Sequence, residues 1–260
     1  MRYFAGLILA FVIFTTTRVA FSAEFIWDRN MVPFGTGIGS LYLVGPIAAG
    51  DYDRFVSAIK RRGAKPFTLY VRSGGGNTLE AMRIGRLVRQ LSLSVYAPLS
   101  DPGNINKASC LRDTDAVGKP VPCICASACS LIWFAGVSRV GLEIYIHSIK
   151  YDESMFKSLS PQEAERMYQQ AMREVHAYLT EMDINDKYYY MMTQTGSSEL
   201  QKVSTPIGGD LGGWPPSYRE WLYAKCAREL KAGGTAAGSC MVEAENEAQI
   251  EAIGHLLNAP

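Results

Sequence analysis

The stretch FTLYVRSGGGNTLEAMRIGRLVRQL, residues 67–91, decides the fold because two periodicities meet in it. Its first seven residues are rich in aromatic and β-branched side chains, which is typical of a strand. From Asn77 onward the apolar residues mostly share one face at helical spacing, and the arginines lie elsewhere. Three glycines separate the two halves, so we expect a strand, a tight turn and a helix.

The neighbouring segments repeat this unit. Strands are expected over 40–47, 93–98 and 141–148, and helices over 51–63 and 125–136. The first of these helices has Asp51 as its expected N-cap and Gly63 as its stop. Strands and helices that alternate at this spacing indicate an α/β fold with a mostly parallel sheet.

The chain divides into three parts by composition. Residues 1–23 are expected to be a signal peptide, residues 24–205 an α/β domain, and residues 206–260 a Gly/Pro-rich linker with a C-terminal helical extension. Within the domain, Ser160, Pro161 and Glu163 predict a capping box that starts a long amphipathic helix. The Tyr- and Met-rich helix that follows suits packing or an oligomer contact.

The N-terminus indicates export. The apolar run FAGLILAFVIF is too short for a comfortable membrane span, and Ala20 with Ser22, or Ala23 alone, supplies the small residues that cleavage needs. We therefore expect a periplasmic or secreted protein, with membrane attachment only if this segment stays uncleaved. Cleavage removes Arg2 and Arg18 and leaves a nearly neutral chain, which argues against a nucleic-acid partner.

Export also decides how the six cysteines are interpreted, because an oxidising compartment favours disulfides. Cys226 and Cys240 flank a helix with a Gly-rich return and could form one bridge. Cys110 could pair with Cys123 or Cys125, and a bridge between Cys125 and Cys129 is a further alternative. Zinc is disfavoured because the chain has no pair of CxxC units and no nearby histidine before His147. We expect no metal and no cofactor.

One serine and one histidine stand out as candidates for catalysis. Ser127 lies at the start of the small-residue helix, where it could be a simple N-cap or a nucleophile beside free backbone N–H groups. His147 follows a strand, at the sheet edge where α/β proteins carry their sites. By contrast, His176 is expected at the boundary of an apolar stripe, and His255 near the C-terminus.

These pieces together resemble a known family. LYLVGPI, VRSGGGNTLEAMRIGRLV, CASACSLIWFAGVSR and IYIHS occur in the order and approximate spacing of the Clp protease/crotonase superfamily, over residues 40–150. The likeness is greatest to exported bacterial proteins of the Clp serine-peptidase type. It implies a ββα-spiral fold and trimers or larger homo-oligomers. Gly74 stands where the family has proline, and the cysteine-bearing segment 100–122 is not a Clp feature.

The resemblance also assigns roles to residues. It implies Ser127 as nucleophile, His147 as general base, and an oxyanion hole made by the N–H of Gly75 or Gly76 with that of Ala128. Ser130 is out of register with the family's serine. For the acid that orients the histidine, the resemblance offers Glu199, with Asp186 and Asp183 as poorer fits.

The expected function is therefore that of an exported Clp-like serine hydrolase, a peptidase that acts on peptides or unfolded protein segments. The alternative is a Clp-fold protein without catalysis that serves as a binding or assembly module, because the orienting acid is uncertain. A crotonase-type acyl-CoA enzyme is disfavoured, since CoA is scarce outside the cytoplasm.

Overall fold

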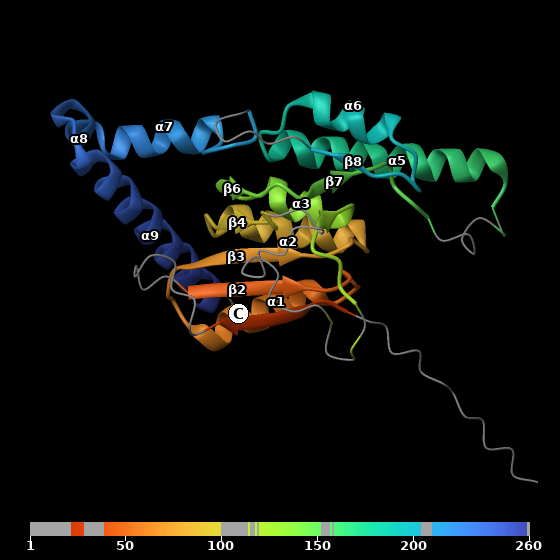
Figure 1. The fold of residues 1–260 in the computed structure, drawn as a ribbon, viewed down its shortest axis with the longest axis horizontal. Coiled ribbons are helices and arrows are strands. Elements are labelled where there is room, and N and C mark those ends of the chain that lie inside the picture. Colours follow the sequence, from red (N-terminus) through yellow and green to blue (C-terminus); the bar gives the residue numbers. More distant parts are fainter. Residues whose placement is uncertain are drawn as a thin grey trace, which may run out of the picture.

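Strands and helices alternate along the first half of the chain, as the sequence predicts, and helices dominate the second half (Figure 1). The computed structural model describes residues 22–28, 39–99, 114, 118, 120–151, 157, 159–203 and 210–258. Its elements are β1 Glu24–Asp28, β2 Gly39–Val44, α1 Asp51–Arg62, β3 Phe67–Arg72, α2 Thr78–Gln90, β4 Ser94–Tyr96, β5 Cys125–Ala126, α3 Ala128–Phe134, β6 Ser138–Val140, β7 Ile144–Ile146, α5 Pro161–Glu181, α6 Asp186–Gln194, β8 Gln201–Lys202, α7 Pro216–Lys225, α8 Ala227–Ala232 and α9 Thr235–Asn258.

The strands form two mixed sheets, and the predicted α/β class is confirmed. The larger sheet has the order β1-β2-β3-β4-β6, and the smaller one has the order β5-β7-β8. The strands at the centre are parallel, whereas β1 and β8 run antiparallel at the edges. The sequence did not predict these two edge strands, because β1 is only half-buried along its length and β8 has two exposed residues, so neither carries a clear alternating pattern.

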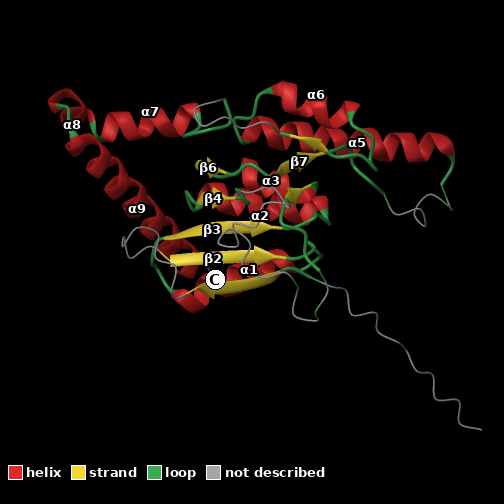
Figure 2. Cartoon of the chain, in the orientation of Figure 1, coloured by secondary structure: helices red, strands yellow, loops and turns green. Residues whose placement is uncertain are grey.

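Alternation of side chains along β2 and β3 places the core on one face of the larger sheet. Leu41, Leu43 and Leu69 point toward the helices and are fully buried with the apolar faces of α1, α2 and α3. On the other face, Tyr42, Tyr70 and Tyr96 form a row of aromatic rings across three strands. Tyr42 stacks on Tyr70 with ring centroids 4.7 Å apart, and the Tyr96 ring is tilted against Tyr70 at 5.1 Å. Figure 2 shows the strands at the centre of the molecule with helices around them.

Of the two N-caps that the sequence predicts, the structure confirms Ser160 and places the other one residue earlier. Asn77 caps α2 by accepting a hydrogen bond from the N–H of Glu80, and the capping box of Ser160 and Glu163 starts α5. The N-cap of α1 differs from the prediction: Gly50 holds this position, and Asp51 is the first helical residue. The Asp51 carboxylate accepts instead from the N–H groups of Ala48 and Ala23, and it pairs with Arg54.

Beyond β8 the helices α7, α8 and α9 form an arm that leaves the α/β core and returns to it (Figure 1). Leu222 and Met241 belong to a small apolar cluster of the arm, and the last turns of α9 insert Ile253 into the main core. Gln249 of α9 accepts from the N–H of Phe67 and donates to the carbonyl of Ser92. The extension is thus attached to the larger sheet by apolar and polar contacts.

The predicted leader, residues 1–23, lies outside the described residues except for Ser22 and Ala23. Ala23 is 3% exposed and donates its N–H to Asp51, so the folded part of the chain includes it. Within the described ranges, no helix combines the length and the apolar character that crossing a membrane requires.

Candidate functional site

Ser127 occupies a sharp turn between a strand and a helix. It follows β5 directly and precedes α3, with φ of 57° and ψ of −127°. A non-glycine residue with such a φ is strained, and strain of this kind occurs often at functional sites. Ser127 is the N-cap position of α3, but its side chain makes no capping hydrogen bond. The simple N-cap interpretation therefore fails, and the Ser127 hydroxyl has no hydrogen-bond partner among the described residues.

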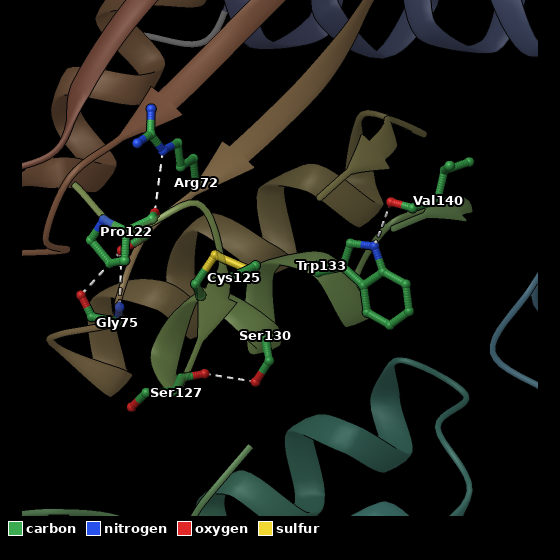
Figure 3. Close-up of a disulfide and its surroundings, with 10 residues drawn as sticks. Arg72, Gly75, Pro122, Cys125, Ser127, Ser130, Trp133 and Val140 are labelled. Carbon is green, nitrogen blue, oxygen red and sulfur yellow. Dashed lines mark hydrogen bonds between the residues drawn. A yellow bond between two sulfur atoms is a disulfide. The ribbon is translucent and has the colours of Figure 1, made fainter. Parts of the chain in front are cut away.

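The glycine turn after β3 lies against this serine (Figure 3). A Cβ added to Gly75, which has φ of +103°, would lie 2.5 Å from the Cβ and 3.0 Å from the Oγ of Ser127. One added to Gly76 would lie 2.1 Å from the carbonyl oxygen of Ile47. Only glycine fits at either position, because both the conformation and the space exclude a side chain.

Two of the three predicted oxyanion donors have free N–H groups. The N–H of Gly75 donates to the Oγ of Ser73 at 3.0 Å, so it is already used. The N–H groups of Gly76 and Ala128 have no acceptor within the described part of the chain. Both residues line the cavity that also contains Ser127. Of the two glycines that the sequence left open, only Gly76 has an N–H without an acceptor among the described residues.

His147 follows β7 and lines the same cavity as Ser127. Its Nδ1 lies 2.5 Å from the carbonyl oxygen of Ser148. A carbonyl oxygen can only accept, so Nδ1 carries the proton in the neutral ring and Nε2 keeps its lone pair. This is the tautomer that a general base needs. The Ser127 hydroxyl and the His147 ring, which both belong to the described part of the chain, are not hydrogen-bonded to each other.

The cavity has a volume of about 550 Å³. A second cavity of about 450 Å³ adjoins it and shares Gly76, Thr78 and residues 149–151. Its walls combine apolar side chains, among them Leu79, Met82 and Met167, with polar and charged ones such as Lys150 and Glu174. Leu79 is exposed there, whereas the other apolar residues of α2 are buried. The two cavities form one depression that runs from the serine along α2 and α5.

None of the three predicted acids reaches His147. Glu199 is exposed, and its carboxylate makes no hydrogen bond with any described residue. Asp186 accepts from His176, and Asp183 pairs with Arg89 and accepts from Ser217. The backbone carbonyl of Ser148 is therefore the only group bonded to the histidine within the described residues.

Sequence reasoning missed several residues of the cavity. Lys150 and Tyr151 follow His147 by three and four positions and line both cavities. The hydroxyl of Tyr151 donates to the carbonyl of Met167 at 3.2 Å. Burial raises the pKa of this phenol, and Glu174 adds to the effect. The sequence could have indicated both residues, because they follow soon after the predicted strand that ends near His147, and residues just past a strand end often lie beside a site.

Two disulfides join cysteines that the sequence named. Cys125 bonds to Cys129, with Cα atoms 5.2 Å apart, and Cys226 bonds to Cys240, with Cα atoms 5.9 Å apart. The alternative pairing of Cys125 with Cys110 is excluded by the first bond. Cys123 is disulfide-bonded as well, and Cys110 lies outside the described residues. Among the described residues, no group of three or more His, Cys, Asp or Glu side chains could hold a metal ion.

Comparison with known proteins adds no assignment: neither the models of known protein families nor the curated proteins contain a match for this chain.

Proposed function

We propose that this protein is an exported serine hydrolase with a Clp/crotonase-like fold, a peptidase in which Ser127 is the nucleophile and His147 the general base. One observation carries the proposal. The strained Ser127 shares a single cavity with a histidine in the base tautomer and with the two free N–H groups of Gly76 and Ala128. Nucleophile, base and oxyanion donors are the three components that acyl transfer requires.

The chemistry follows from these positions. Ser127 Oγ attacks the substrate carbonyl carbon while Nε2 of His147 accepts the hydroxyl proton. The negative charge on the carbonyl oxygen is stabilised by the N–H groups of Gly76 and Ala128. Collapse of this intermediate expels the amine, which takes the proton from His147, and leaves an ester on Ser127. Water, deprotonated by His147, then hydrolyses the ester and restores the serine.

A peptide or an unfolded protein segment suits the paired cavities as a substrate. An extended chain could place its carbonyl at Ser127 and a side chain against Leu79, Met82 and Met167 in the second cavity. Export to the periplasm or beyond agrees with the disulfides and with the N-terminal sequence. Assembly into trimers or larger homo-oligomers is part of the same proposal and rests on the family resemblance alone.

A fluorophosphonate probe tests this proposal directly, because it modifies only an activated serine. We expect the probe to label the wild-type protein at neutral to mildly alkaline pH and not to label the Ser127→Ala variant. Ser197→Ala is the matched control, since Ser197 lines the same cavity and should leave labelling unchanged. His147→Ala should slow labelling by about 10² to 10⁴-fold. Absence of labelling in folded wild-type protein would refute the hydrolase.

A second function, that of a binding or assembly module without catalysis, is favoured by one observation. Among the described residues no carboxylate bonds His147 and no hydrogen bond joins it to Ser127. The module predicts that the wild type is not labelled and that peptide binding in the cavity is indifferent to Ser127→Ala.

A further inference from the structure

The Cys125–Cys129 disulfide encloses the nucleophile. Cys125 opens the two-residue strand β5, Cys129 is the second residue of α3, and Ser127 lies midway between them (Figure 3). Both cysteines are fully buried. The bridged loop also contains Ala128, whose N–H is one of the two free oxyanion donors. Nucleophile and donor therefore lie within one covalent ring.

Hydrogen bonds hold each side of the turn separately. On the strand side, the N–H groups of Cys125 and Ser127 donate to the carbonyls of Glu143 and Tyr145, at 2.8 and 2.9 Å. On the helix side, the N–H and the hydroxyl of Ser130 donate to the Ser127 carbonyl at 3.0 and 2.6 Å. These bonds fix β5 and the first turn of α3, and the burial of all seven residues of α3 also holds the helix in place. The turn between the two elements consists of residues 126–128, and the Cys125–Cys129 disulfide is the covalent link that spans it.

The turn needs such a constraint because Ser127 is strained. A residue at φ of 57° returns to a relaxed conformation unless its surroundings hold it there. The strand has two residues and the helix seven, so each is short. Relaxation at Ser127 would move its Oγ away from the glycine turn and rotate the Ala128 N–H out of the cavity.

We propose that the Cys125–Cys129 disulfide positions the nucleophile: it holds the strained turn so that Ser127 Oγ and the Ala128 N–H face the same point in the cavity. This inference rests on the proposed hydrolase function. Cys125 and Cys129 are positioning residues here, because neither lines the cavity.

The second disulfide provides the matched control. Cys226–Cys240 joins the junction of α7 and α8 to α9 within the small apolar cluster of the arm, apart from the main core beside Ser127. It closes a longer loop, with a sequence separation of 14 against 4, so its loss should lower stability at least as much. A purely structural role for both disulfides predicts that the two losses affect labelling alike.

The experiment compares Cys125→Ala/Cys129→Ala with Cys226→Ala/Cys240→Ala in fluorophosphonate labelling, well below the unfolding temperature of each. The maximal labelling rate constant is separated from the concentration of probe that gives half of it. For the first pair we expect the rate constant to fall about 100-fold, because a displacement near 1 Å has that effect, with the half-saturating concentration unchanged. For the second pair we expect the wild-type rate constant.

The remaining outcomes are decisive as well. Equal rate constants for both variants, unchanged or equally reduced, would overturn the inference while the labelled wild type still supported the hydrolase. An unlabelled wild type would remove the proposed function and this inference with it. If Cys125→Ala/Cys129→Ala does not fold, the same pair is made with Ser127→Gly, which relieves the strain. Recovery of folding there, but not with Ser127→Ala, supports the proposal, and failure in both backgrounds overturns it.

Discussion

Gly75→Ala should disable the site while the protein still folds. The added Cβ would lie 2.5 Å from the Ser127 Cβ and 2.9 Å from the Ala126 carbonyl oxygen, where ordinary contacts are 3.4–4 Å. Relief therefore requires the two turns to separate by about 1 Å, and a displacement of this size costs about 10²-fold in rate. Holding alanine at this positive φ adds a conformational cost of about 1–3 kcal/mol to folding.

Gly63→Ala is the control that separates these two effects. Gly63 has φ of +81°, so alanine is also conformationally unfavourable at this position, but its Cβ would meet no atom within 4 Å. The assay is the fluorophosphonate labelling rate, measured beside urea unfolding of both variants. We expect both variants to lose stability through the unfavourable φ, and Gly75→Ala to lose more because of its clash. The labelling rate should fall about 100-fold only for Gly75→Ala. A folded Gly75→Ala protein with the wild-type labelling rate would show that the glycine turn does not fix the nucleophile.

Two further predictions concern stability. Burial raises the pKa of Glu245, so the folded state binds its proton more tightly than the unfolded state does, and ionisation of this carboxyl disfavours folding as pH rises through the raised pKa. Glu245→Gln, which can still accept from Trp214, should therefore raise the melting temperature at neutral pH, with an advantage that shrinks toward acid pH; a pH-independent gain would contradict the linkage. Tyr178→Phe removes the hydrogen bond from the buried hydroxyl to the Leu131 carbonyl, 2.8 Å away, and should cost about 1–2 kcal/mol in urea unfolding. An unchanged free energy of unfolding for Tyr178→Phe would mean that another donor reaches the Leu131 carbonyl.

The sequence could predict the parts of the site that local backbone chemistry defines. The glycines after β3 and the small residues around Ser127 indicate turns, because those residue types are needed where chains approach closely. The features that depend on contacts with another part of the chain could not be predicted from the sequence. Whether the N–H of Gly75 is free depends on the rotamer of Ser73, which the sequence does not specify. The edge strands β1 and β8 also depend on tertiary pairing, since neither has a pattern that would select it.

The partner of His147 shows how such a contact changes the expected chemistry. A carboxylate in this place would fix the tautomer and also stabilise the imidazolium that forms when the serine loses its proton. The Ser148 carbonyl fixes the same tautomer through Nδ1, so the large loss of about 10⁴-fold that follows from the wrong tautomer does not apply. A neutral acceptor nevertheless forms a weaker bond to the charged ring than a carboxylate does. The site is therefore expected to react readily with an activated phosphonate and to turn over amide substrates slowly.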